Sequence, residues 1–178
     1  QSDHEAKREL EVLGSGRDVA AAFFAGLAND PALVQGADPL KAVTFYQAAG
    51  VFPGAKHNLA LLALKGVGLA GQEPLDPIAL LTDAAAKGRV ESMLLLATLY
   101  DEGWPGLERN SALAAQWYER AAEYANEPRA VARLGAAYQD GSGRPVDQVK
   151  AETYLLAAAK AGISEAQYRM AFLAPDKT

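Results

Sequence analysis

The sequence predicts an all-α fold, a solenoid of antiparallel helix hairpins, and three observations support this prediction. Alanine accounts for 38 of the 178 residues, a composition that favours helix over strand. Apolar residues recur with helical spacing. An internal repeat has turn glycines 37 and 38 residues apart, a period that matches a pair of helices with two turns.

The repeat is clearest in residues 55–68, 92–106 and 130–143, and part of it returns in residues 166–174. A small residue is followed four places later by a large apolar one and then by another small one, as in Ser92, Leu96 and Ala97. We therefore expect a single repeat domain over residues 1–178. Its parts are an N-terminal segment (1–18), a degenerate repeat (19–54), three repeats (55–91, 92–129, 130–165) and a half repeat or truncated cap (166–178).

The expected helix ends carry the residue types that begin and stop helices. Asp38 and Asp76 each precede a proline, which is the order of a capping side chain and a first-turn residue. Ser164 opens another helix, and Gly88 and Gly162 stand where a C-terminal glycine is expected.

The shared positions of the repeat also predict how the helices pack. Alanine and glycine allow the two helices of a hairpin to approach closely. Larger residues are expected to reach from one hairpin to the next, since a single hairpin cannot bury them. These residues are Leu59, Leu96, Leu134, Tyr100, Tyr138, Trp117 and Tyr154.

Together these positions resemble the Sel-one-like repeat (SLR) family, relatives of the tetratricopeptide repeats. The resemblance covers roughly residues 21–174 and is sharpest over residues 92–166. The matching residues there are Leu96, Tyr100, Gly103, Trp117, Tyr118, Ala121, Ala122, Leu134, Gly135, Tyr138, Gly141, Gly143, Asp147, Ala158, Ala159, Gly162 and Ala166. One departure is that Asn126, Glu127 and Pro128 replace the usual glycine turn. The resemblance implies a right-handed α-solenoid of about four repeats.

Composition excludes several classes of function. The net charge of −5 gives no electrostatic footprint for nucleic acid or an anionic membrane. Absence of cysteine excludes disulfides, zinc–thiolate sites and a cysteine nucleophile. No run approaches the roughly 20 apolar residues of a transmembrane helix, so no transmembrane segment is expected.

Three features that could indicate catalysis or ligand binding are each better explained by a structural role. Residues 66–71 spell Gly-x-Gly-x-x-Gly, but they follow an expected helix rather than a strand, so we interpret them as a repeat turn with positive φ. His57 has no acidic or histidine partner one turn away. Asp101, Glu102 and Asp140 are interpreted as solvated helix ends. We expect no catalytic residue, cofactor or metal, and therefore no enzyme.

Trp104 lies in a turn where the corresponding residues of the other repeats are Val67 and Ser142. It either packs over its own hairpin or stands out as an anchor for a partner. We favour packing, because most tryptophan side chains are largely buried.

If the constant positions build the stack, the differing positions on the first helices line its inner face, where solenoids bind partners. The mixture of charged and apolar side chains suits a polypeptide better than a small molecule. The candidate partner-binding residues are Asn58, Leu61, Lys65, Leu95, Thr98, Glu102, Arg133, Ala136, Asp140 and Arg169.

The family resemblance implies a non-enzymatic protein-binding module, an adaptor or scaffold of a bacterial envelope or secretion-related assembly. It also allows an immunity protein that neutralises a toxic secreted effector and, more remotely, a small-ligand or catalytic protein. A periplasmic or exported location is expected, with a lipid anchor upstream of residue 1 as one form of it, and the cytoplasm is the alternative. The last repeat stops after its first helix, so either a cap is missing or that end is a docking surface.

Overall fold

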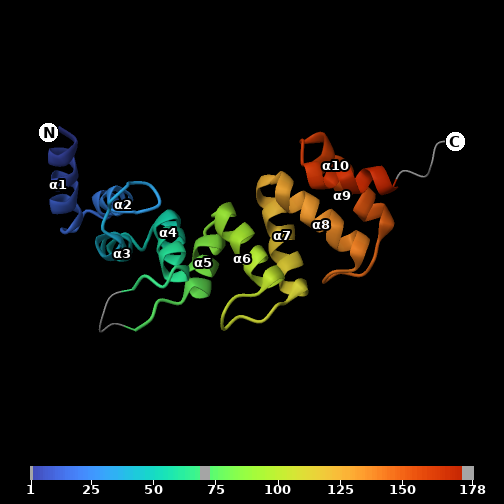
Figure 1. Cartoon of the computed structure of the whole chain (residues 1–178), viewed down its shortest axis with the longest axis horizontal. Coiled ribbons are helices and arrows are strands. Elements are labelled where there is room, and N and C mark those ends of the chain that lie inside the picture. Colours follow the sequence, from blue (N-terminus) through green and yellow to red (C-terminus); the bar gives the residue numbers. More distant parts are fainter. Residues whose placement is uncertain (1, 69–72, 174–178) are drawn as a thin grey trace. The chain divides into compact units, whose positions relative to one another are not determined.

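The computed structural model describes residues 2–68 and 73–173, and the chain divides into two compact units, Gln1–Arg89 and Val90–Thr178. Figure 1 shows that both are built of helices. The first unit contains α1 (Ser2–Gly14), α2 (Val19–Ala28), α3 (Pro39–Ala48), α4 (Pro53–Leu64) and α5 (Pro77–Ala86). The second contains α6 (Val90–Glu102), α7 (Ser111–Ala125), α8 (Pro128–Asp140), α9 (Gln148–Lys160) and α10 (Ser164–Leu173).

The helices pack as hairpins, which confirms the predicted all-α solenoid fold. In the first unit α2 packs on α3 and α4 on α5; in the second, α6 packs on α7 and α8 on α9. Each of these pairs corresponds to one expected repeat, although α4, α6 and α8 each begin two residues before the expected boundary. Helix α10 packs on α9 and contacts α8, as the first helix of a further repeat would.

Side chains that accept backbone hydrogen bonds begin several helices. The Oδ1 atoms of Asp18, Asp38 and Asp76 accept hydrogen bonds from the backbone N–H groups two and three residues later. This confirms the capping role predicted for Asp38 and Asp76. Gly88 and Gly162 follow helices with φ of +86° and +88°, also as predicted.

Asn126 replaces the expected glycine after α7. Its φ is +49°, the left-handed conformation, and it is the one non-glycine residue with positive φ in the described parts of the chain. Its N–H donates to the carbonyl of Ala122 at 2.8 Å. Asparagine tolerates this conformation better than other side chains, so the helix ends without a glycine.

Glycine allows close approach within two of the hairpins. A Cβ atom added to Gly26 of α2 would lie 2.5 Å from the ring of Tyr46 on α3. A Cβ atom on Gly135 of α8 would lie 2.9 Å from Cγ of Leu155 on α9. The prediction that small residues allow the paired helices to approach closely is therefore confirmed at both places.

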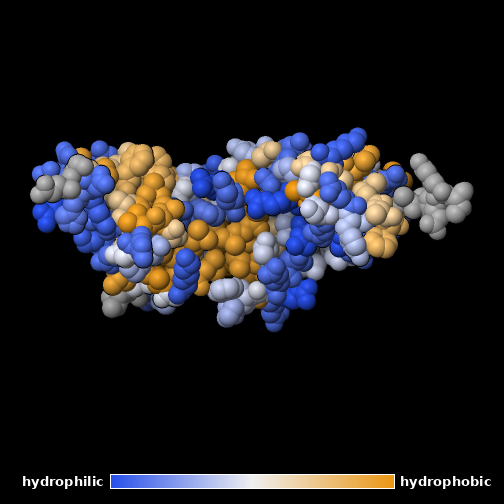
Figure 2. All heavy atoms as spheres, turned by 45° about the horizontal axis from the view of Figure 1, so that its top comes forward, coloured by the Kyte–Doolittle hydropathy of each residue, from blue (hydrophilic) through white to orange (hydrophobic). Residues whose placement is uncertain are grey.

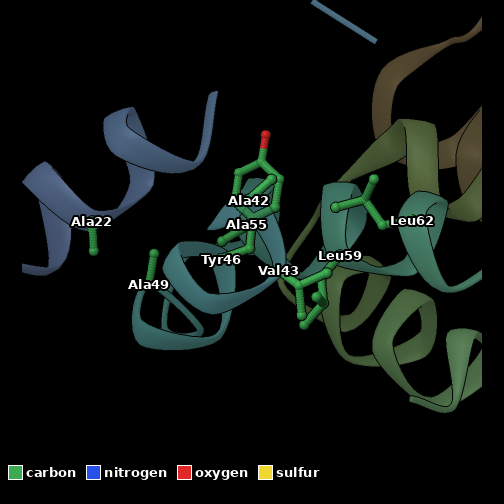
Figure 3. Close-up of a cluster of buried hydrophobic side chains, with 8 residues drawn as sticks. All are labelled: Ala22, Ala42, Val43, Tyr46, Ala49, Ala55, Leu59 and Leu62. Atoms are coloured by element: carbon green, nitrogen blue, oxygen red, sulfur yellow. The ribbon is translucent and has the colours of Figure 1, made fainter. Parts of the chain in front are cut away.

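The core of the first unit surrounds Tyr46, which is fully buried with Val43, Leu59 and Leu62 (Figure 3). The Tyr46 hydroxyl donates to Oδ2 of Asp30 at 2.8 Å and accepts from Nδ2 of Asn58 at 3.0 Å. Burial raises the pKa of Tyr46, and the hydrogen bond to Asp30 raises it further. The phenol therefore stays protonated and satisfies a buried carboxylate.

In the second unit a buried cluster joins successive layers. Val131 of α8 and Leu155 of α9 are buried in it, and Ala122 of α7 and Met170 of α10 pack against it. Four helices therefore share one apolar cluster, which a single hairpin could not form. Leu96 and Leu134 are also buried, as predicted.

Tyr138 differs from its predicted role as a link between hairpins. It is buried beside Leu134 and Ala151, and its ring stacks on Tyr154 with centroids 5.8 Å apart and planes 2° apart. Because Tyr154 and Ala151 belong to α9, these contacts lie within the α8–α9 hairpin. The residues that join the layers here are those of the cluster around Val131.

Residues 1–18 do more than precede the first repeat, because most of them form α1, which packs on α2. Glu11 accepts hydrogen bonds from Nδ2 of Asn29 at 3.0 Å and from Nζ of Lys41 at 2.9 Å. Burial acts to raise the pKa of Glu11, but these hydrogen bonds and the nearby positive charges bring it below its ordinary value. Glu11 thus ties α1 to α2 and α3.

Replacing Tyr46 by phenylalanine should lower the free energy of unfolding by about 1–3 kcal/mol, because Oδ2 of the buried Asp30 loses its donor. Urea denaturation measures the effect. The matched control is Tyr124→Phe, at a tyrosine that is 66% exposed, where a change below about 0.5 kcal/mol is expected. Equal stability of the two variants would contradict the role given to Tyr46.

Glu11→Gln should make the first unit less stable at neutral pH and almost equal to the parent in acid. A lowered folded-state pKa contributes stability above the ordinary value of 4.5, and this contribution is lost as the pH falls through the lower folded-state value. Thermal melts between pH 3 and pH 7 measure the difference between the two proteins. A difference that does not change with pH would show that the charge of Glu11 is not what holds α1.

Candidate interaction surface

Two neighbouring depressions lie on the second unit. The smaller, with a volume of about 90 Å³, is called the pocket here and is lined by Asp101, Ser111, Ala114, Ala115, Tyr118, Arg133, Ala136, Ala137, Asp140, Ser142 and Arg169. The larger and more open one, of about 530 Å³, is called the groove and is lined by Gln139, Asp140, Glu165, Tyr168, Arg169 and Phe172. Asp140 and Arg169 line both.

Arg169 is held in place between the two depressions. Its Nη1 donates to Oε1 of Gln139 at 2.8 Å and to Oδ2 of Asp140 at 2.9 Å, and its Nε donates to Oε1 of Glu165 at 3.3 Å. The partners come from the end of α8 and from the first turn of α10. This charged side chain is therefore fixed before any partner binds.

Arg133 is less completely paired. Its Nη1 lies 3.7 Å from Oε1 of Glu165, within the range of an ion pair but beyond that of a hydrogen bond. Glu165 thus faces two guanidinium groups, and Arg133 retains free donors toward the pocket.

Tyr118 is buried in the wall of the pocket. Burial raises the pKa of its hydroxyl, a hydrogen bond with Thr98 and the charge of Arg133 lower it, and the charges of Asp101 and Glu102 raise it. The net direction is upward, so the hydroxyl stays protonated. The pocket therefore offers a neutral hydroxyl among charges of both signs.

The groove carries two exposed aromatic rings one helical turn apart. Tyr168 is 67% exposed and Phe172 is 72% exposed, and their ring centroids lie 4.8 Å apart with planes at 62°. This edge-to-face contact restrains both side chains. Aromatic rings restrained in this way suit an interface, because little side-chain freedom is left to lose.

Of the seven candidate residues that belong to the second unit, four come together: Arg133, Ala136, Asp140 and Arg169 line the pocket. Thr98 and Glu102 interact with Tyr118 but are not part of the lining. Leu95 is half-buried and lines neither depression. Ala136 is buried, so it shapes the wall of the pocket and offers a partner little surface.

The other three candidates, Asn58, Leu61 and Lys65, belong to the first unit. Asn58 is half-buried, and its side chain donates to Tyr46. Leu61 is half-buried and Lys65 is exposed at the end of α4. The hydrogen bond of Asn58 gives that residue an internal role that the sequence pattern did not predict.

Sequence reasoning missed the aromatic part of the surface. Tyr168 and Phe172 are four residues apart, a spacing that places them on one face of a helix. Phe172 aligns with Leu61, Thr98 and Ala136, which are candidate positions in the other repeats, so the repeat alignment itself carried a signal for it. Asp101 was considered for acid–base chemistry and interpreted as a solvated helix end, whereas the structure places it in the lining of the pocket with Asp140.

Trp104 lies between the two alternatives. Its side chain is 42% exposed, so the expected packing is only partial and much of the indole stays accessible. The turn is a tight one: the backbone N–H groups of Trp104 and Leu107 donate to each other's carbonyls at 3.0 and 2.7 Å, and Gly106 has φ of +84°. A rigid turn therefore presents the indole.

The first unit has an exposed apolar area of its own. Phe23 contacts Phe24 and Phe52, with ring centroids 5.9 and 5.8 Å apart, and Phe24, Phe52 and Val51 are exposed. Figure 2 shows a broad hydrophobic area over the first unit that extends beyond α2 and α3, whereas hydrophilic atoms surround smaller hydrophobic areas toward α10. Contiguous apolar areas of this kind often mark interaction sites.

The other features considered for chemistry have structural roles. His57 is buried on α4. Gly66 follows α4 with φ of +75°, as predicted, whereas Gly68 does not have the predicted positive φ and Gly71 lies outside the described residues. In the described ranges no three His, Cys, Asp or Glu side chains are placed to hold a metal ion. Every helix described is too short or too polar to cross a bilayer.

Comparison with known proteins gives consistent matches. The model of the Sel1 repeat family matches residues 90–123 and 128–163. A Sel1 repeat protein from Oxalobacter formigenes has a similar crystal structure, with a TM-score of 0.70 and 30% identity, over 85% of this chain and 62% of that one. A protective antigen present in uropathogenic Escherichia coli strains, which displays an SLR fold, matches with a TM-score of 0.53 and 22% identity, over 90% of this chain and 43% of that one. No curated protein matches the sequence.

The chain thus spans about three fifths of the first of these proteins and less than half of the second. At its level of identity, the second similarity concerns the fold alone. Both family-model matches fall within the second unit, which also carries the pocket and the groove.

Proposed function

Because this chain belongs to the Sel1 repeat family, we propose that it is a non-enzymatic protein–protein interaction module, an adaptor or scaffold of a bacterial envelope or secretion-related assembly. Sel1 repeats mediate contacts between proteins. The observation that carries the proposal is the surface around Arg169, where fixed charges separate a small pocket from an open groove with two exposed aromatic rings.

This surface has the composition of a protein interface. Arginine and tyrosine are enriched where proteins bind each other, and restrained aromatic side chains commonly dominate the binding energy. The exposed Phe24 and Phe52 of the first unit and Trp104 of the second add further groups of this kind. Several separate contact areas suit an adaptor, which holds more than one protein.

A small-molecule site fits the geometry less well. Such sites usually enclose about 300–1,000 Å³ and are mostly apolar. The pocket, of about 90 Å³, is smaller than this, and charged and hydroxyl-bearing residues line it together with four alanines. The groove is large enough, at about 530 Å³, but it is an open depression.

An exported location, in the periplasm or beyond, is part of the proposal, and the cytoplasm is the alternative. Fractionation of the native cells distinguishes them. The second candidate function, an immunity protein that binds a toxic effector, needs one tight partner rather than several. The acidic net charge of −5 is compatible with such a role.

Affinity capture from the native cells with the full chain as bait tests the function. Capture of several envelope proteins is expected, and their dependence on the surface can be measured with the double charge reversal Arg133→Glu and Asp140→Lys. Retention should fall by about tenfold, because the ion pairs with Glu165 and Arg169 become repulsive and the surface changes its charge pattern. Circular dichroism should show unchanged helicity.

The matched control reverses two exposed charges of α9, Glu152→Lys and Lys160→Glu, and should leave capture unchanged. One dominant partner with nanomolar affinity would favour the immunity function over the scaffold. Undiminished capture by the Arg133 and Asp140 variant would show that this surface does not take part in binding the captured proteins. Failure to retain any protein above an unrelated bait would contradict the proposed function itself.

A further inference from the structure

The charges around the pocket and the groove do not balance. Three carboxylates, those of Asp101, Asp140 and Glu165, face the two guanidinium groups of Arg133 and Arg169. Arg169 bonds to both Asp140 and Glu165, and Arg133 is near Glu165. Within these linings the excess is therefore one negative charge, and the nearby charges of Glu102 and of Arg109, whose Nε donates to the backbone carbonyl of Asp101, offset each other.

Asp101 is the carboxylate of these linings that forms no ion pair with Arg133 or Arg169. In the part of the chain that the structure describes, its carboxylate takes part in no ion pair, and its backbone carbonyl accepts from Nε of Arg109 at 2.8 Å. Asp101 lines the pocket together with the hydroxyl groups of Ser111 and Ser142. A positively charged group in the pocket would find acceptors on both sides.

The sizes of the two depressions limit what they hold. The pocket, of about 90 Å³, has room for about three water molecules, which is enough for the end of one side chain. The groove, of about 530 Å³, holds larger groups and offers the rings of Tyr168 and Phe172. Aromatic rings accept both apolar side chains and the stems of lysine and arginine.

We propose that the partner segment bound here is a polypeptide that presents a lysine or arginine side chain beside an apolar one. The basic group enters the pocket between Asp101 and Asp140, and the apolar side chain packs against Tyr168 and Phe172 in the groove. This inference rests on the proposed function and specifies the chemistry of its partner. An acidic segment would meet the excess negative charge and would be repelled.

Selection from a random 12-residue peptide library displayed on phage, with the immobilised full-length chain as target, tests the proposal. The selected peptides should be enriched in Lys or Arg at a fixed spacing from an apolar residue. Synthetic copies of the strongest should lose about fivefold to tenfold in affinity with Asp101→Asn, measured by fluorescence anisotropy. The affinity should also fall as the salt concentration rises, because a charge pair contributes to it.

Two matched controls separate local from general effects. Glu152→Gln removes an exposed carboxylate of α9 outside both depressions, and should leave the affinity unchanged. Tyr168→Ala with Phe172→Ala should weaken the same peptides about tenfold or more, whereas Tyr124→Ala, which removes an exposed ring of α7, should not. Circular dichroism of each variant checks that the fold is retained.

Selection of acidic peptides, selection without any basic preference, or no selection at all would overturn the proposal. So would peptides whose affinity is equal for the parent chain and for Asp101→Asn. In all of these cases the proposed function survives if the native proteins are still captured through this surface. Loss of native capture together with a negative peptide selection would contradict both the proposed function and the proposed chemistry of its partner.

Discussion

Close contact between two helices at a small residue is the constraint on which this structure depends. Gly26 and Gly135 each leave no room for a Cβ atom, because Tyr46 and Leu155 of the paired helix occupy that space. The two helices of the hairpin can pack this closely only if the residue of the first helix at the contact has no side chain. Once it closes, Leu155 lies in the shared cluster that holds the next layer.

The candidate surface follows from this arrangement. Helices α8 and α10 are placed near each other by the cluster around Val131 and Leu155, and the end of α8 therefore faces α10. Arg169 then reaches Gln139 and Asp140, which are 30 and 29 residues earlier in the chain. The same packing leaves Tyr168 and Phe172 outside the cluster, where they are free to contact another protein.

The repeat predicted most of the fold, because a turn glycine, a capping aspartate and a buried leucine act through their immediate neighbours. The first helix was missed since it has no copy elsewhere in the chain. Ala136 was placed on the surface because aligned repeats show which positions differ but not how deeply a short side chain lies. The pairing of Arg133 and Arg169 with Glu165 depends on how α10 sits against α8, which spacing alone does not determine.

The free energy of unfolding of Gly135→Ala tests this constraint most directly, with Ala157→Gly at an exposed position of α9 as the measure of helix propensity. Propensity alone would make Gly135→Ala more stable by about 1 kcal/mol. Close packing against Leu155 predicts the opposite, a loss of about 1–3 kcal/mol in urea denaturation. A gain in stability equal to the loss seen for Ala157→Gly would contradict the account.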